Sequence, residues 1–318
     1  MADKKKIIVI CGPTASGKTG LSLLIASKFN GEIISADSMQ VYKSMDIGSA
    51  KIKPEEMNGV PHYLVDVLDP AEEFHIVKFQ EMAKEAMEKI YANGHIPILV
   101  GGTGFYIQAI VKDIDFTENE ENTEVRAKWE QFAKDHGAES LHAELEKIDP
   151  KSAESIPAGN VKRVVRALEF YELSGKRISE HNEEQKAKGS PYNFAYFVLN
   201  DHRNLLYDRI EKRIDEMVEE GLVKEVQGLK DRGFTKNMVS MQGLGYKEIL
   251  DYLEGNLTLE EAIYILKRDT RHFAKRQLTW FRREESVSWI NKYEYDYDNE
   301  KILDAMLCIL KDKGILGE

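Results

Sequence analysis

Short, largely apolar runs alternate with longer amphipathic stretches over the first hundred residues of the chain. Three runs have the composition of strands buried on both faces of a parallel sheet, at residues 6–11, 32–36 and 96–100. Apolar residues recur with helical periodicity over residues 18–28 and 74–93, where Gly94 supplies a C-terminal cap signal. This alternation of strand and helix predicts an α/β fold with a parallel sheet.

The pattern changes near Asp115. From residue 115 to residue 191 the chain is polar and helix-like and carries no strand signal. The later pattern predicts a strand at 193–199, mostly helix to residue 283, a short strand at 286–290 and a terminal helix near 300–311. The simplest interpretation is a core formed by residues 1–114 and 192–318, interrupted by a mostly helical insertion domain at 115–191.

Between the first predicted strand and helix, the sequence Gly-Pro-Thr-Ala-Ser-Gly-Lys-Thr matches the P-loop pattern completely. This loop consists of Gly12, Pro13, Thr14, Ala15, Ser16, Gly17, Lys18 and Thr19. Its N–H groups and the following helix N-terminus would surround a phosphate, with Lys18 as a mobile charge and the Thr19 hydroxyl as an Mg²⁺ ligand. The core is therefore expected to be a P-loop NTPase-like parallel sheet flanked by helices.

A P-loop does not by itself indicate nucleotide hydrolysis. Hydrolysing P-loop proteins usually hold Mg²⁺ with an acidic residue at the end of a second apolar strand. The strand predicted at 96–100 is followed instead by Gly101-Gly102-Thr103-Gly104. The loop could therefore bind a diphosphate that leaves during a reaction, in place of part of a nucleotide.

Polar residues also follow the second predicted strand, beginning with Asp37. The carboxyl ends of parallel strands meet at one edge of a sheet, so Asp37 and Thr103 should lie beside the P-loop. A carboxylate there can accept a proton from a nucleophile or bind a metal through water, although a turn aspartate is the alternative. Gln40 could hydrogen-bond to the edge of a base or simply lie on the surface.

The distribution of charge matters more than the net charge of −11, which argues only mildly against a nucleic-acid partner. Residues 267–283 are strongly basic with aromatic residues interleaved, and residues 162–166 form a second basic cluster. Cys11 and Cys308 cannot build a disulfide framework, and no apolar span reaches membrane length. We therefore expect a cytoplasmic protein with no membrane partner.

Seven motifs resemble, in the same order, those of the bacterial tRNA dimethylallyltransferases (tRNA isopentenyltransferases). They are the P-loop and residues 36–42, 100–106, 163–169, 206–217, 243–248 and 274–282. Many families share the P-loop, whereas the ordered set is specific. The resemblance extends from about residue 6 to residue 290.

The resemblance implies roles for individual residues. Asp37 resembles the general base that takes a proton from the exocyclic amine of adenine, and Thr103 resembles the residue that orients this amine. Lys18, Thr19 and Arg209 resemble the residues that hold the diphosphate and Mg²⁺. The residues expected to contact tRNA are Asp37, Ser38, Met39, Gln40, Thr103, Lys162, Arg163, Arg166, Lys275, Arg276, Gln277, Trp280 and Arg282.

Some of these positions have structural alternatives. Arg209 and Arg213 lie four residues apart on one predicted helix face and could pair with acidic neighbours on the same helix. Trp280 could be a core residue. The family often has Asn-Pro-Gln-Arg where Asn160-Val161-Lys162-Arg163 stands here, which leaves the role of Lys162 open.

The resemblance implies an enzyme that transfers a dimethylallyl group from dimethylallyl diphosphate to the exocyclic amine of the adenosine 3′-adjacent to the anticodon. Its substrates would be tRNAs that read codons starting with U, its cofactor Mg²⁺ and its by-product diphosphate. An asymmetric anticodon stem-loop needs only one site, so we expect a monomer. The alternatives are a P-loop small-molecule or nucleoside kinase, which leaves the insertion and the basic helix unexplained, and a non-catalytic tRNA-binding module.

Overall fold

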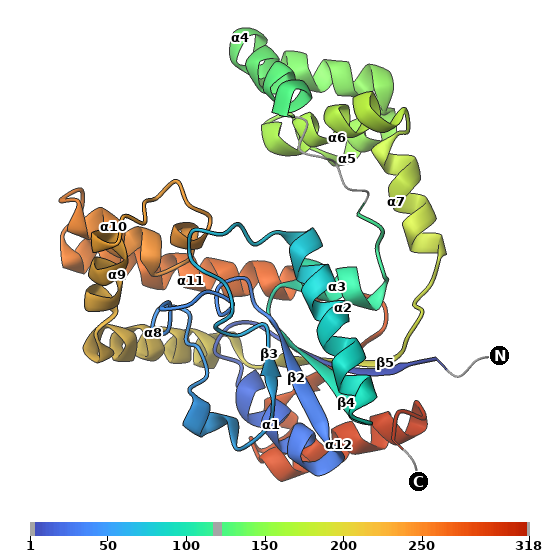
Figure 1. Cartoon of the computed structure of the whole chain (residues 1–318), viewed down its shortest axis with the longest axis vertical. Helices are drawn as coiled ribbons and strands as arrows, with labels where there is room; N and C mark the ends of the chain where they lie inside the picture. The colour runs from blue at the N-terminus through green and yellow to red at the C-terminus, as the bar shows by residue number, and fades with distance from the viewer. Residues whose placement is uncertain (1–3, 117–122, 317–318) are drawn as a thin grey trace. The chain divides into compact units, whose positions relative to one another are not determined.

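The computed structural model describes residues 4–116 and 123–316 of the chain (Figure 1). The chain divides into two compact units. One, here called the core unit, comprises the residues up to Val111 and those from Pro191 onward. The other, here called the insert unit, comprises Lys112–Ser190. None of the described helices is both long and apolar enough to cross a membrane.

The core unit contains a six-stranded sheet in the order β3-β2-β4-β1-β5-β6. The strands are β1 Lys6–Cys11, β2 Gly31–Ala36, β3 His62–Tyr63, β4 Ile96–Gly101, β5 Asn193–Asn200 and β6 Val287–Asn291. Every pairing is parallel, which confirms the predicted sheet. The sequence pattern missed β3 because two residues are too few to show a periodicity.

Helices cover both faces of this sheet, and β1 shows why its run is continuously apolar. Ile7, Val9 and Cys11 pack into one hydrophobic cluster, whereas Ile8 and Ile10 pack into the cluster on the other side. All five side chains are fully buried. The larger cluster includes residues of α2 Ile76–Ala92, α3 Gly104–Val111, α8 Arg203–Glu220, α9 Leu222–Asp231, α10 Tyr246–Leu253 and α11 Leu259–Phe281. The smaller one includes residues of α1 Lys18–Phe29 and α12 Asn299–Asp312, drawn at the two ends of the colour range in Figure 1.

The insert unit is helical and has a hydrophobic core of its own. Its helices are α4 Thr123–Ile148, α5 Pro150–Ser155, α6 Val161–Ser174 and α7 Ile178–Ala187. Leu141 and Leu145 of α4 pack against Val164 and Leu168 of α6, and all four are fully buried. The α4 segment bends at Gly137, which has φ 84 and ψ 166. This separate core shows that α4 to α6 stabilise one another.

The parallel arrangement brings the chemically important residues of the core unit to one edge of the sheet. The P-loop follows β1, Asp37 follows β2 and Gly102 follows β4. Asp201 follows β5, and Lys292 follows β6 as the first residue of the 3₁₀ helix η3 Lys292–Tyr295. These positions define where a ligand can bind.

The contact between β2 and β4 leaves no room for a side chain at Gly101. A Cβ atom there would lie 2.2 Å from the carbonyl oxygen of Ala36. We expect Gly101→Ala to lower the free energy of unfolding by about 1–3 kcal/mol, because backbone must move to accept the methyl group. Urea unfolding would measure the change.

Gly228→Ala is the matched control for this substitution. Gly228 lies inside α9, and a Cβ atom there would meet nothing within 4 Å. Alanine should stabilise the helix at this position by up to about 1 kcal/mol. Equal urea midpoints for the two variants would contradict the steric argument.

Candidate active site

The P-loop has the backbone conformation expected for a phosphate-binding loop. Gly12, Ala15 and Gly17 have positive φ values of 153, 61 and 87. The Ser16 N–H donates to the Pro13 carbonyl at 3.3 Å, which closes the turn. Helix α1 then begins at Lys18 with no acidic residue in its first turn and no side-chain cap. Its first N–H groups and its dipole are therefore available to an anion.

Lys18 lies over this loop. Its Nζ donates to the carbonyls of Gly12 at 3.0 Å and Pro13 at 2.8 Å. Burial lowers the pKa of Lys18 to about 8, although the nearby Asp37 carboxylate opposes the shift. A lysine held this way can turn its ammonium from the loop carbonyls to a bound phosphate.

A cavity of about 420 Å³ joins the P-loop to the ends of β2 and β4. Thr14 lines it from the P-loop, Asp37 and Met39 from the β2 end, and Thr103 from the β4 end. Phe74, Ile210, Ile214, Leu266 and Phe273 give it an apolar wall. The cavity therefore combines one end at the P-loop, a carboxylate and room for an apolar group.

Asp37 is both a turn aspartate and a cavity residue. Its Oδ1 accepts from the backbone N–H groups of Met39 at 2.8 Å and Gln40 at 3.3 Å. Its Oδ2 has no hydrogen-bond partner among residues 4–116 and 123–316. The turn thus fixes the carboxylate and leaves one oxygen for a ligand.

Arg213 of α8 lines the same cavity and faces Asp37. Burial lowers the pKa of Arg213, and the Asp37 carboxylate counteracts that shift. Of the two acidic neighbours on this helix, Asp215 pairs with Lys267 at 2.6 Å and Glu216 pairs with Lys212 at 3.5 Å. The Glu216 carboxylate also counteracts the lowering of the Arg213 pKa. Arg213 was not among the site residues predicted from the sequence, although its i,i+4 spacing from the functional candidate Arg209 was a usable signal.

Arg209 lies one turn earlier on α8 and pairs with Asp201, the residue that follows β5. Its Nε also donates to the Leu205 carbonyl at 3.2 Å. Arg209 is therefore fixed at the carboxyl edge of the sheet, but it does not line the cavity that holds Asp37.

The amide of Gln40 is engaged within the protein. Its Nε2 donates to the carbonyls of Ser49 at 3.4 Å and Ala50 at 3.2 Å, and the Ser35 hydroxyl donates to its Oε1 at 3.3 Å. In this structure, Gln40 supports the loop that carries Ser49 and Ala50, both of which line the cavity.

Gln277 of α11, expected to contact tRNA, points instead into the interior. It is only 7% exposed. The Thr14 N–H donates to its Oε1 at 2.9 Å, and its Nε2 donates to the Gly102 carbonyl at 3.0 Å. Gln277 therefore connects α11 to the P-loop and to the turn after β4, and its expected contact with tRNA stays a prediction.

Glu225 of α9 anchors another wall of the cavity. Its carboxylate accepts from the N–H groups of Asp46 at 2.8 Å, Ile47 at 2.7 Å and Gly48 at 3.0 Å. The Tyr246 hydroxyl also donates to it, at 2.8 Å. Gly48 lines the cavity, so this carboxylate fixes the shape of the site. No sequence motif signalled the role of Glu225.

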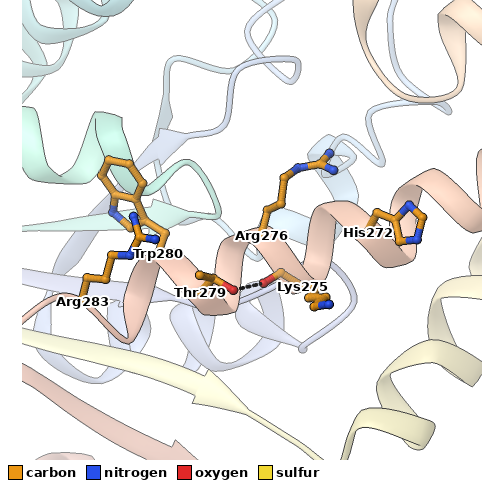
Figure 2. A pocket seen from close by; sticks show the side chains of 6 residues that line it. All are labelled: His272, Lys275, Arg276, Thr279, Trp280 and Arg283. Atoms are coloured by element: carbon orange, nitrogen blue, oxygen red, sulfur yellow. Dashed lines mark hydrogen bonds between the residues drawn. The ribbon is translucent and has the colours of Figure 1, made fainter. Parts of the chain in front are cut away.

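A second hollow, of about 430 Å³, lies along α11. Figure 2 shows its lining side chains, which are His272, Lys275, Arg276, Thr279, Trp280 and Arg283. Arg276 also lines the cavity that holds Asp37, so the two hollows share a residue. We call this hollow the basic groove. His272 and Arg283 belong to the basic stretch 267–283 recognised in the sequence, although neither was among the individual residues expected to contact tRNA.

Trp280 is half-buried in this groove. A Cβ atom on Gly104 would lie 2.1 Å from its indole Cδ1, so only glycine allows this approach. Phe105 packs edge-on against the indole, with ring centroids 6.2 Å apart. Trp280 therefore packs against the start of α3 while it lines the groove. Arg282 is exposed on the segment just after α11.

The basic residues at 162–166 belong to the insert unit. Lys162, Arg163 and Arg166 are exposed on α6, whose opposite face carries the buried Val164, Val165 and Leu168. Helical periodicity thus gives this helix one apolar face and one basic face.

The donor atoms around the P-loop fit Mg²⁺ better than a metal held entirely by protein. Among the described residues, no group of three His, Cys, Asp or Glu side chains could hold a metal ion. Magnesium is usually held by one or two protein oxygens together with substrate phosphates and water. The Thr19 hydroxyl, exposed in the first turn of α1, is such an oxygen.

Comparison with known proteins is consistent with this geometry. Residues 40–284 match the family model described as IPP transferase. A tRNA dimethylallyltransferase of Lachnoclostridium phytofermentans is 57% identical, over 98% of this chain and 99% of that protein. One from Acetivibrio thermocellus is 52% identical, over 97% and 98%. The chain belongs to the tRNA dimethylallyltransferase family.

Solved structures agree with this assignment. The full-length tRNA isopentenylpyrophosphate transferase of Bacillus halodurans is 45% identical and matches with a TM-score of 0.73, covering 98% of both chains. A eukaryotic dimethylallyltransferase acting on tRNA is 31% identical, with a TM-score of 0.76 over 90% of this chain and 74% of that one. Membership of this prenyltransferase family favours prenyl transfer over the kinase alternative.

The lowered pKa of Lys18 predicts a pH dependence. The ammonium form attracts an anion and the neutral amine does not, so affinity for inorganic diphosphate should fall as the pH rises through about 8. Titration calorimetry between neutral and alkaline pH would measure this. Lys18→Arg keeps its charge over that range and controls for ionisation of the diphosphate itself. Parallel pH curves for the two proteins would refute the prediction.

The position of Gln277 predicts a loss of stability on substitution. Gln277→Leu leaves the Thr14 N–H and the Gly102 carbonyl without their partner, at a cost of about 1–3 kcal/mol for each group. Lys275→Gln, on the exposed face of the same helix, should change the free energy of unfolding by less than about 0.5 kcal/mol. If both variants unfold at the same urea concentration as the wild type, the two hydrogen bonds of Gln277 contribute nothing to the free energy of unfolding.

Proposed function

We propose that this chain transfers the dimethylallyl group of dimethylallyl diphosphate to the exocyclic amine of the adenosine 3′-adjacent to the anticodon. The substrates would be tRNAs that read codons starting with U. The proposal rests on the observation that Thr14 of the P-loop, Asp37 and Thr103 line the same cavity. Phosphate-binding and proton-accepting groups are thereby close enough to act on one reaction.

The main task of the protein is to stabilise the diphosphate as it leaves. As the carbon–oxygen bond of the allylic diphosphate breaks, negative charge collects on the diphosphate while the allylic carbon becomes electron-poor. The N–H groups of the P-loop and Lys18 lie where they can stabilise that charge, and one such oriented donor contributes about 3 kcal/mol. This assistance lowers the barrier to carbon–oxygen cleavage.

The adenine amine is a weak nucleophile because its lone pair is delocalised into the ring. Its nitrogen bonds to the allylic carbon, and the amine proton passes to Oδ2 of Asp37. Thr103 would orient the amine. General base catalysis of this kind contributes about 10²–10⁴-fold.

Magnesium is included in the proposal on the basis of the donor atoms. The Thr19 hydroxyl would hold Mg²⁺ next to the diphosphate. Bound there, the ion would neutralise part of the negative charge on the leaving group.

The remaining surfaces suit an RNA substrate. A stacked adenine must be extruded before its amine can react, and Met39, Phe74 and Phe273 offer apolar surfaces that replace the lost stacking. The basic groove on α11 and the exposed face of α6 would contact tRNA phosphates. We expect a cytoplasmic monomer, since one asymmetric stem-loop requires one site.

The decisive test is transfer to RNA. We expect the wild-type protein with Mg²⁺, dimethylallyl diphosphate and an unmodified anticodon stem-loop to add one C₅H₈ unit to the target adenosine. Asp37→Asn keeps the size of the side chain and removes the base, so the rate should fall by about 10²–10⁴-fold. Mass spectrometry of the RNA would measure both rates.

Two controls make the result specific. Filter binding of the stem-loop should be similar for the wild type and Asp37→Asn, because the substitution removes a proton acceptor and leaves the basic groove intact. A parallel reaction receives ATP in place of the prenyl donor. Consumption of ATP with unmodified RNA would overturn the proposal in favour of a kinase.

A further inference from the structure

Lys292 places an ammonium group at the N-terminus of α1, although it lies far from the P-loop in sequence. It is the first residue after β6, and β6 is separated from β1 only by β5. A Cβ atom on Gly17, the residue that precedes α1, would lie 3.1 Å from the Lys292 Nζ. The lysine therefore reaches the part of the P-loop where the helix N–H groups begin.

Within the described part of the chain, this ammonium makes no direct contact with an acidic group. Among residues 4–116 and 123–316, no hydrogen bond or ion pair within 4 Å involves the Lys292 Nζ. The side chain is half-buried. Burial and the positive charge of Arg209 lower the pKa of Lys292, while Asp201 acts in the opposite direction. A partly buried and unpaired cation is unfavourable in the free protein.

The carboxylate that attracts Lys292, Asp201, already has other partners. The Asp201 side chain is inaccessible to solvent and forms an ion pair with Arg209. It also accepts from the Tyr297 hydroxyl at 3.0 Å and from the His202 N–H at 2.7 Å. Asp201 thus pairs directly with Arg209, and Lys292, whose Nζ lies beside Gly17, has no carboxylate of its own within the described residues.

We propose that Lys292 is a further diphosphate-binding residue, which supplements Lys18 and the N–H groups of α1. The inference rests on the proposed function for the identity of the ligand, a prenyl diphosphate. The Lys292 ammonium lies beside Gly17 of the P-loop. This position favours the diphosphate as its ligand over the phosphates of RNA, because the P-loop is the segment expected to bind the diphosphate. Lys292 contributes binding and charge neutralisation, and it takes no part in proton transfer.

Titration calorimetry with inorganic diphosphate and Mg²⁺ tests this role. We expect Lys292→Gln to weaken diphosphate binding about tenfold, equivalent to about 1.4 kcal/mol. Lys292→Arg should restore most of the affinity because it keeps a positive charge. The matched control is Lys28→Gln, which removes one charge from an exposed lysine in the last turn of α1, the helix that follows the P-loop. It should bind diphosphate like the wild type.

The inference is overturned if Lys292→Gln binds diphosphate with wild-type affinity, or if Lys28→Gln loses just as much. It is also overturned if Lys292→Gln weakens binding of the stem-loop and leaves diphosphate binding unchanged, since the lysine would then serve RNA.

A measurement on the wild-type protein covers the case in which the variant does not fold. Acylation of lysines, followed by mass spectrometry, should show that diphosphate protects Lys292 and Lys18 but not Lys28. Protection of Lys18 alone would refute the role of Lys292. Both experiments report on binding, so they remain informative even if the RNA transfer assay fails and the proposed function is wrong.

Discussion

Parallel pairing of the strands is the constraint on which the site depends. Since all six strands run in the same direction, the segments that follow them emerge at one edge of the sheet. The P-loop, Asp37 and Thr103 follow β1, β2 and β4, which are neighbours in the sheet although their order along the chain differs. The register brings Cys11 next to Gly101, and Gly101 next to Ala36, so the three strands end at the same level.

The edge so formed carries more positive charge than the neighbouring carboxylates balance. Lys18, Arg213 and Lys292 all have lowered pKa values, and burial is the largest cause in each case. Burial of these charged groups is unfavourable in the free protein, and a bound anion would offset that cost. Such a compromise between stability and function is common at binding sites.

Helix α11 serves the site with two different faces. Gln277 points inward and bonds to both the P-loop and the turn after β4. Lys275 and Arg276 line the basic groove on the outer side. Gln277 is buried while Lys275, two positions away, is exposed, so neighbours in the sequence have different roles because they project from different faces of the helix. A surface proposed to contact RNA is thereby rigidly connected to the phosphate-binding loop.

The sequence by itself determined every strand but the short β3, the P-loop and the place of Asp37 at a strand end, because buried parallel strands need apolar runs and a phosphate loop needs glycines at fixed spacing. Only the tertiary structure decided which polar side chains act together. Gln277 bonds to Thr14 across 263 positions. Likewise, the proximity of Lys292 to Gly17 arises from the order of β1, β5 and β6. Local patterns carry no information about such contacts, since these depend on which strands lie side by side and how the helices pack on them.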